Sequence, residues 1–243
     1  MTSIFRIGDS ADEVVLKFAT LFQQVEAFYF TYYFPSLGLE ERISSSANAN
    51  LVKIFNDARN LRTAIGPALP YWESIIATSS PTAEFALFAK ESVRHSNDPQ
   101  QRYEIKRTEI NRTRLDKMIE SMAEEQALAF CSICKLPEGI TGFIPMMDFR
   151  IAPNPTNLEK MSVVIQEIGL PGLILGSGKS YHFFGTKLLT ESEIQKFLGK
   201  CLLISPITDS RYIGHRMMEG SCDLRISTSK YKQTLPRVVK IFE

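Results

Sequence analysis

The stretch that decides the fold reads Leu173-Ile-Leu-Gly-Ser-Gly-Lys-Ser-Tyr-His182-Phe-Phe184. Two short apolar runs flank a turn of small residues, a pattern typical of two buried strands joined by a tight loop. Upstream, residues 156–168 carry apolar side chains at helical spacing and end at Gly169-Leu-Pro-Gly172. With an apolar strand predicted over residues 142–151, the sequence gives a strand, helix, strand unit whose strand ends carry polar residues.

Charged side chains follow the predicted strands. Asp148 and Arg150 are two residues apart, so on a strand they point to the same face and into one cleft. A second apolar run, Cys201–Ile207, comes after a short helix predicted over residues 191–199. We expect this run to be a strand that ends at Asp209. The alternative is that Asp148 and Asp209 cap strand ends or pair with Arg150 and Arg211.

The turn at Gly176–Ser180 invites comparison with phosphate-binding loops. A Walker A loop needs a glycine at position 173, where the sequence has leucine, and the turn leads into a strand instead of a helix. The dinucleotide fingerprint fails as well, because three glycines at its spacing are missing. What remains is a turn that lets a phosphate approach the backbone, followed by Lys179 and His182, which suits a nucleoside triphosphate. A core histidine is the alternative for His182.

Helices are predicted in the first half of the chain. A capping box at Ser10 and Glu13 opens one, and others are expected over residues 48–65, 80–93 and 100–130. The aromatic stretch Phe28–Phe34 predicts a packed corner of the fold, with base stacking as the alternative. The charged segment 100–130 predicts a solvated helix, with a face for a nucleic-acid strand as the alternative.

Composition narrows the class of protein. The chain has 243 residues, 44% of them hydrophobic and 23% charged, with a formal net charge of +1, which excludes a mainly disordered chain and a surface coated in positive charge. No membrane span or secretory signal is evident, so a cytoplasmic location is expected. Residues 1–130 hold 14 basic and 17 acidic side chains, and residues 131–243 hold 14 and 10. We therefore expect a helical region over 1–130 and an α+β domain with a mixed sheet over 131–243.

The four cysteines are expected to be thiols. They are too few and too clustered for a secreted disulfide framework. Cys131 and Cys134 have zinc-ligand spacing, but no second such pair exists, so zinc is not expected.

At this point the C-terminal half resembles the archaeo-eukaryotic primase superfamily, also called primase-polymerases. The family has three motifs in order: a strand ending in two acids, a turn of the form Ser-Gly-x-x-x-His, and an apolar strand ending in aspartate. Here Asp148 with Arg150, Ser177–His182, and Asp209 are similar to these motifs. Arg216 and Arg225 are similar to basic residues that follow the third motif. The resemblance spans about residues 140–230.

The resemblance implies roles for these residues. Asp148 and Asp209 would hold Mg²⁺ or Mn²⁺, and with His182 they would form the catalytic set; carboxylates are natural ligands of these ions. The triphosphate would be bound by residues of the turn and by two arginines: Ser177, Gly178, Lys179, Ser180, His182, Arg216 and Arg225. Expected partners are nucleoside triphosphates, DNA or RNA, and a protein bound through the helical region.

The first motif departs from the family pattern at position 150, where an acid is replaced by arginine. A guanidinium there puts positive charge where a metal ion would lie. Two hypotheses follow: a primase-polymerase-like nucleotidyltransferase acting in DNA replication and impaired by Arg150, or a non-catalytic module that binds nucleotide or nucleic acid. A helical interaction scaffold is a third.

Overall fold

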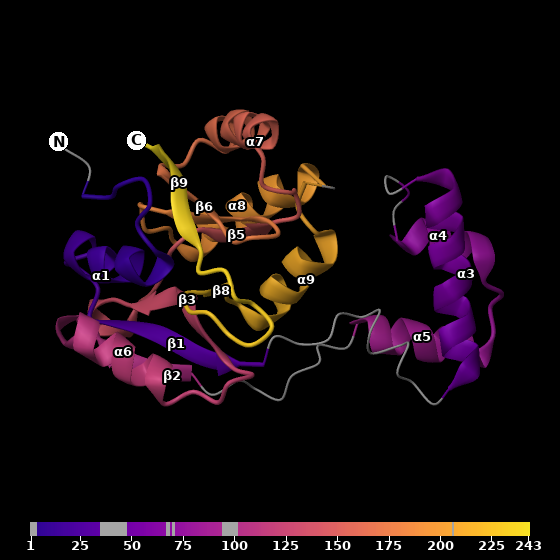
Figure 1. Ribbon diagram of the computed structural model, residues 1–243, viewed down its shortest axis with the longest axis horizontal. Coiled ribbons are helices and arrows are strands. Elements are labelled where there is room, and N and C mark those ends of the chain that lie inside the picture. Colours follow the sequence, from indigo (N-terminus) through magenta and orange to yellow (C-terminus); the bar gives the residue numbers. More distant parts are fainter. Residues whose placement is uncertain (1–3, 35–47, 67–68, 70, 94–101, 206) are drawn as a thin grey trace. The chain divides into compact units, whose positions relative to one another are not determined.

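Two antiparallel sheets form the larger of two units in the computed structural model (Figure 1). The structure describes residues 4–34, 48–66, 69, 71–93, 102–205 and 207–243. The larger unit takes the described parts of residues 1–35 and 99–243, and a helical unit takes those of 36–98. The α+β class predicted from the sequence is confirmed, and each unit is described by itself.

The larger unit contains nine strands with helices before and between them. Its strands are β1 (Ala27–Tyr33), β2 (Arg102–Lys106), β3 (Ala127–Lys135), β4 (Thr141–Phe143), β5 (Met146–Phe149), β6 (Gly172–Gly176), β7 (Tyr181–Gly185), β8 (Asp223–Arg225) and β9 (Arg237–Phe242). Its helices are α1 (Ala11–Leu21), α6 (Arg112–Glu120), α7 (Pro155–Ile168), α8 (Glu191–Leu203) and α9 (Ser210–Glu219), with short 3-10 turns η1 (Arg107–Glu109) and η2 (Pro137–Gly139).

The strands pair in two orders. One sheet runs β2-β1-β3-β4, and β8 pairs with β3 beside β4; the other runs β5-β7-β6-β9. Every pairing between these strands is antiparallel. The mixed sheet expected from the sequence is therefore replaced by two antiparallel ones.

The four-stranded sheet is buried on both faces. Because successive side chains alternate, Met147 and Phe183 join an apolar cluster with α7 and α8, whereas Leu173 and Phe184 join a second cluster with α1 and the five-stranded sheet. Figure 1 shows α7 beside this sheet, on the side away from β1 and β3. Burial on both faces explains why β6 and β7 are almost continuously apolar.

The strand predicted over residues 142–151 is two strands in different sheets. β4 pairs with β3, β5 pairs with β7, and Pro145 lies between them. Proline has no N–H to donate to a ladder, so pairing is interrupted there. Its carbonyl still accepts from the N–H of Gly185, at 2.7 Å. The chain therefore crosses from one sheet to the other immediately before Asp148.

The helix predicted over residues 100–130 is wrong in extent. Its ends are strands β2 and β3, which pair with β1 on either side, and between them lie the 3-10 turn η1 and the α-helix α6. The prediction failed because the partner strand lies about 70 to 100 residues earlier in the chain, outside any local pattern. The aromatic stretch before it forms β1, where Phe28 and Phe30 are fully buried, so the predicted packing role is confirmed for these two rings.

The predicted strand over Cys201–Ile207 is also wrong. Helix α8 continues to Leu203, with Cys201 buried in the apolar cluster and Leu203 exposed. A single bridge then joins Thr208 to Phe149 at the end of β5. Asp209 is consequently the N-cap of α9 and not the end of a strand.

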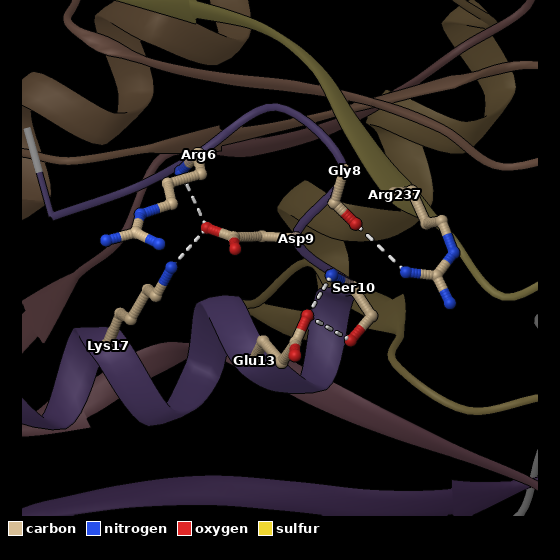
Figure 2. A network of polar contacts seen from close by, with 7 residues as sticks. All are labelled: Arg6, Gly8, Asp9, Ser10, Glu13, Lys17 and Arg237. Carbon is tan, nitrogen blue, oxygen red and sulfur yellow. Dashed lines mark hydrogen bonds and ion pairs between the residues drawn. The ribbon is translucent and has the colours of Figure 1, made fainter.

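The predicted capping box at the start of α1 is confirmed, and Figure 2 shows it within a polar network. Glu13 accepts hydrogen bonds from the backbone N–H and the hydroxyl of Ser10, at 2.7 and 2.9 Å. Asp9 accepts from the N–H of Arg6 at 2.7 Å and pairs with Lys17, and Arg237 of β9 donates to the carbonyl of Gly8 at 2.9 Å. The contact of Arg237 with Gly8 joins the segment before α1 to the last strand, β9.

The helical unit comprises α3 (Ala49–Ile65), α4 (Tyr71–Thr78) and α5 (Ala83–Val93). The first and third were predicted. Asn48, the predicted first residue of α3, is its N-cap and accepts from the N–H groups of Asn50 and Leu51. The predicted boundary near residue 130 falls inside β3, and the division of the chain into units follows other positions. None of the helices in the described ranges is long and apolar enough to cross a membrane.

We expect Phe130→Ala to destabilise the larger unit by about 4 kcal/mol, because its ring is fully buried between the rings of Phe18, Phe28 and Phe30 and its removal leaves a cavity. Urea unfolding followed by circular dichroism measures the change. Leu203→Ala, at a side chain that is 87% exposed, is the matched control and should change stability by less than about 0.5 kcal/mol. Equal losses for both variants would contradict this view of the core.

Candidate functional site around Asp148

Asp148 and His182 face each other across a strand pair. They are directly opposed in the antiparallel register of β5 and β7, so their side chains lie on the same face of the sheet. His182 Nε2 lies 3.7 Å from Asp148 Oδ1. Burial, with the nearby charges of Arg225 and Lys232, lowers the pKa of His182 to about 3, so the imidazole is neutral at physiological pH. Its Nδ1 is buried and has no hydrogen-bond partner in the part of the chain that the structure describes.

The turn between β6 and β7 brings hydroxyl groups to the same carboxylate. Ser180 Oγ donates to Asp148 Oδ1 at 3.0 Å and lies 3.0 Å from Ser177 Oγ. The N–H of Ser177 donates to the carbonyl of Ser180 at 2.9 Å, which closes the turn. Gly178 has a φ of +100°, and a Cβ there would lie 2.9 Å from the side chain of Thr234. Only glycine fits this position without strain.

Arg225 reaches the turn from the other sheet. It lies at the end of β8, is 5% exposed, and donates through Nη2 to the carbonyl of Ser177 at 3.3 Å and through Nη1 to that of Ser227 at 2.6 Å. A buried guanidinium held by carbonyl groups keeps its charge in a fixed place. We call Asp148, Ser177, Ser180, His182 and Arg225 the Asp148 cluster.

The Asp148 carboxyl group is an unusually weak acid. Burial raises its pKa to about 6; the hydrogen bond from Ser180 and the charges of Lys232 and Arg225 oppose the rise, and the charge of Asp209 adds to it. The side chain is nevertheless 43% exposed, so solvent screens part of this effect. Around neutral pH the group is mainly a carboxylate beside a neutral imidazole.

Asp209 lies close enough for its charge to act on Asp148, although it comes from a helix cap and not from a strand end. Its Oδ1 accepts from the N–H groups of Arg211 and Tyr212, at 2.9 and 3.4 Å. Its Oδ2 lies 3.4 Å from Arg150 Nη1, and the guanidinium is more than half exposed. The predicted alternative, in which Asp209 pairs with Arg150, describes these contacts.

A two-metal centre does not fit these residues. Among the described residues no group of three or more histidine, cysteine or acidic side chains is placed to hold an ion. Both oxygens of Asp209 are engaged, one by backbone N–H groups and one by Arg150. Asp148 is left as the carboxylate through which an ion could be bound, and Mg²⁺ held by one carboxylate completes its shell with water and substrate oxygens.

The other residues named from the sequence lie at different places. Lys179 is exposed on the turn of the Asp148 cluster. Arg216 lies on α9, with its guanidinium 2.7 Å from Glu219 Oε2 and 5.1 Å from the centre of the Tyr212 ring. The four cysteines are buried thiols, and Cys222 Sγ lies 2.7 Å from Tyr212 Oη.

Two residues near the cluster were not foreseen. Burial raises the pKa of Tyr33, at the end of β1, to about 12, and the charges of Arg225 and Asp148 act on its hydroxyl. The charge of Lys232 acts on both Asp148 and His182. Tyr33 was hidden in the aromatic stretch read as packing. Lys232 could have been identified from the sequence, because it belongs to the basic and aromatic run Lys230-Tyr-Lys232 downstream of the third motif.

A comparison with protein families decides the relationship. The family model described as archaeo-eukaryotic primase 1D-like (AEP-like) matches residues 106–237, more than half of the chain. The chain belongs to this archaeo-eukaryotic primase-like family. The resemblance seen in the sequence is thereby confirmed, and the family match begins earlier than the motifs do. No curated protein and no solved structure matches the chain.

Ionisation of Asp148 should lower the stability of the larger unit at neutral pH. Because the pKa of Asp148 is raised in the folded state, folding favours its protonated form, and stability falls as pH rises from the ordinary value of 3.8 through about 6. At about pH 8 the free energy of unfolding of Asp148→Asn, measured in urea, should therefore exceed that of wild type by about 1 kcal/mol after allowance for solvent screening. At about pH 4 the two should differ little.

Asp57→Asn, which removes a carboxylate paired with Lys53 on the surface of α3, is the control and should show no such gain. An Asp148→Asn protein that is less stable than wild type at about pH 8 would show that the ionised carboxylate is stabilised by its surroundings.

Proposed function

We propose that this chain binds the magnesium complex of a nucleoside triphosphate at the Asp148 cluster, and that nucleotidyl transfer there is weak. The observation that carries the proposal is the convergence of two sheets on one turn: Ser180 donates to Asp148, and Arg225 holds the carbonyl of Ser177. Membership of a primase-like family supports nucleotide and nucleic acid as the ligand class.

The turn supplies groups that suit phosphate. Gly178 and Lys179 are exposed, and Gly178 has no side chain of its own to cover its backbone. Lys179 and Lys232 add positive charge, and a lysine acts on phosphate as a point charge. The neutral His182 can donate or accept a hydrogen bond but brings no charge. Phosphate oxygens would therefore meet lysines and backbone N–H groups beside a single carboxylate.

Asp148 does not oppose this binding when a magnesium ion enters with the substrate. A carboxylate alone repels phosphate, whereas a divalent ion carried by the triphosphate is attracted by the same carboxylate. Arg150 already neutralises the negative charge of Asp209, so Asp209 attracts a cation less. The attraction for the magnesium ion therefore comes from Asp148. The ligand of the proposed site is thus the metal complex, in keeping with the described residues, among which no group of three or more metal-binding side chains is found.

Weak transfer follows from the ion pair at position 150. The guanidinium of Arg150, 3.4 Å from Asp209, repels a second cation placed between Asp209 and Asp148. Two unit charges near 4 Å apart repel by about 4 kcal/mol at an effective dielectric constant of about 20, so the cost is a few kcal/mol. Without a second cation, the attacking and leaving oxygens of an in-line displacement lose one of their two stabilising charges. The primase-like fold is then retained for binding more than for synthesis.

Lys179→Ala should weaken binding of magnesium nucleoside triphosphates by about tenfold, because it removes an exposed charge from the turn without touching the core. Isothermal titration calorimetry measures the affinity. Lys187→Ala is the matched control, since Lys187 is an exposed lysine just after β7 whose charge lies 3.9 Å from Glu193, and it should bind as wild type does. Ser180→Ala tests the carboxylate side of the turn.

Unchanged affinity in both Lys179→Ala and Ser180→Ala would remove the turn from the nucleotide site. Absence of any triphosphate binding by the wild-type chain would contradict the proposed function itself.

Arg150→Asp should raise nucleotide incorporation under Mn²⁺ by about tenfold or more over a weak wild-type level, because it replaces the opposing charge with a metal ligand. Primer extension on a templated oligonucleotide measures the rate. Arg150→Ala removes the charge without adding a ligand and should give a smaller rise. Strong wild-type synthesis that Asp209→Asn abolishes would show that Arg150 is tolerated and that the chain is a competent polymerase.

A further inference from the structure

An exposed aromatic ring stands at a tight turn beside the proposed nucleotide site. Tyr231 is 62% exposed, and among the described aromatic side chains only Phe34 is comparably uncovered. It lies between Lys230 and Lys232, which are both exposed as well. A single exposed ring on a surface needs no ligand to explain it. Tyr231 is informative because it lies between two exposed lysines, in a turn whose backbone contacts the Asp148 cluster.

Backbone hydrogen bonds order the turn that carries this ring. The N–H of Ser229 donates to the carbonyl of Lys232 at 3.0 Å, and the N–H of Lys232 donates back to the carbonyl of Ser229 at 3.1 Å, so Lys230 and Tyr231 form a two-residue hairpin tip. Lys230 is anchored in turn: its N–H donates to the carbonyl of Glu124 at 3.0 Å, and its Nζ lies 3.6 Å from Glu125. We call residues 229–232 the tyrosine hairpin.

The tyrosine hairpin is joined to the Asp148 cluster by shared contacts. Arg225 Nη1 lies 3.4 Å from the carbonyl of Lys232, while Nη2 of the same guanidinium donates to Ser177. Thr234, two residues beyond the hairpin, packs against Gly178. The charge of Lys232 reaches both Asp148 and His182. One buried arginine therefore contacts the backbone of the Ser177 turn and the backbone of the tyrosine hairpin.

The surroundings of the ring select the class of ligand. Its neighbours in the hairpin are lysines, which are unfavourable at the core of a protein interface. A combination of exposed aromatic rings with lysines is the composition of surfaces that bind single-stranded nucleic acid, where bases stack on the rings and lysines meet the phosphates. Bases within a duplex are already stacked and hidden from such a ring, so an unpaired base is required.

We propose that Tyr231 is a stacking platform for an unpaired base of a single-stranded DNA or RNA, and that Lys232 binds the phosphate next to that base. This inference rests on the proposed function, since it gives the nucleotide site an adjacent strand-binding site. Lys230, whose charge is paired with Glu124 and Glu125, holds the hairpin in place. The hairpin is already ordered by its own hydrogen bonds, so little conformational entropy is lost on binding.

Fluorescence anisotropy of the full chain tests this with two fluorescein-labelled oligonucleotides of about 12 nucleotides, within the range that such sites cover. One is oligo(dT), and the other is an abasic strand with the same phosphates and no bases. Tyr231→Ala should weaken binding of oligo(dT) by about tenfold and leave binding of the abasic strand unchanged. Tyr231→Phe should bind as wild type does, and Tyr231→Leu, which keeps apolar bulk without a ring, should behave as Tyr231→Ala.

The charge and duplex arms complete the design. Lys232→Ala should weaken both oligonucleotides equally, whereas Lys187→Ala should weaken neither, and Tyr231→Ala should leave binding of a blunt duplex unchanged. Equal affinity of wild type and Tyr231→Ala for oligo(dT), or absence of oligo(dT) binding by wild type, would overturn the inference. Loss of triphosphate affinity in Tyr231→Ala as large as the loss for oligo(dT) would overturn it too, because the ring would then serve the nucleotide and not the strand.

These outcomes separate the inference from the proposed function. Triphosphate binding by calorimetry tests the Asp148 cluster alone, and it can succeed while oligo(dT) binding fails. Tyr231 is exposed and belongs to neither apolar cluster of the larger unit, so its variants should fold as wild type does, which thermal unfolding verifies.

Discussion

The antiparallel register of β5 against β7 is the constraint on which the rest of the site depends. It opposes Asp148 to His182 and, one residue along, Met147 to Phe183. One face of the pair therefore carries the polar groups next to the buried Met146 and Phe184, and the other packs against α7 and α8. A slip of one residue would bury the carboxylate among apolar side chains. The apolar packing of Met147 and Phe183 therefore holds the polar pair in place, and core and site are specified by the same pairing.

Sequence reasoning succeeded where the signal was local. The turn at residues 177–182, the capping box of α1, and helices α3 and α7 depend on neighbours within a few residues, and each was predicted. It failed where strands pair over long distances. Segment 100–130 looks helical because its charges alternate, yet β1 turns its two ends into strands, and no local pattern reports that partner.

Asp209 shows an intermediate case. Its proximity to Asp148 was predicted, but through a strand that does not exist. The apolar run before it belongs to the end of α8, and a single bridge from Thr208 to Phe149 carries the chain to the end of β5. Residue type and order along the chain predicted the neighbourhood of this acid and, as an alternative, its pairing with Arg150. Its contacts with the N–H groups of α9 were missed because the helix start was taken for the end of a strand.

The helical unit lies at a point in the chain where its length has little effect on the sheet. It is inserted between β1 and β2, which are paired neighbours, with Thr31 opposite Arg102. The paired strands on either side of the insertion therefore lie about one strand spacing apart, near 5 Å. The entropic cost of closing such a loop grows only slowly with its length. The two strands can therefore be connected by a whole helical unit as well as by a short hairpin turn. The length of this insertion can therefore change without a change in the register of the sheet, on which the Asp148 cluster depends.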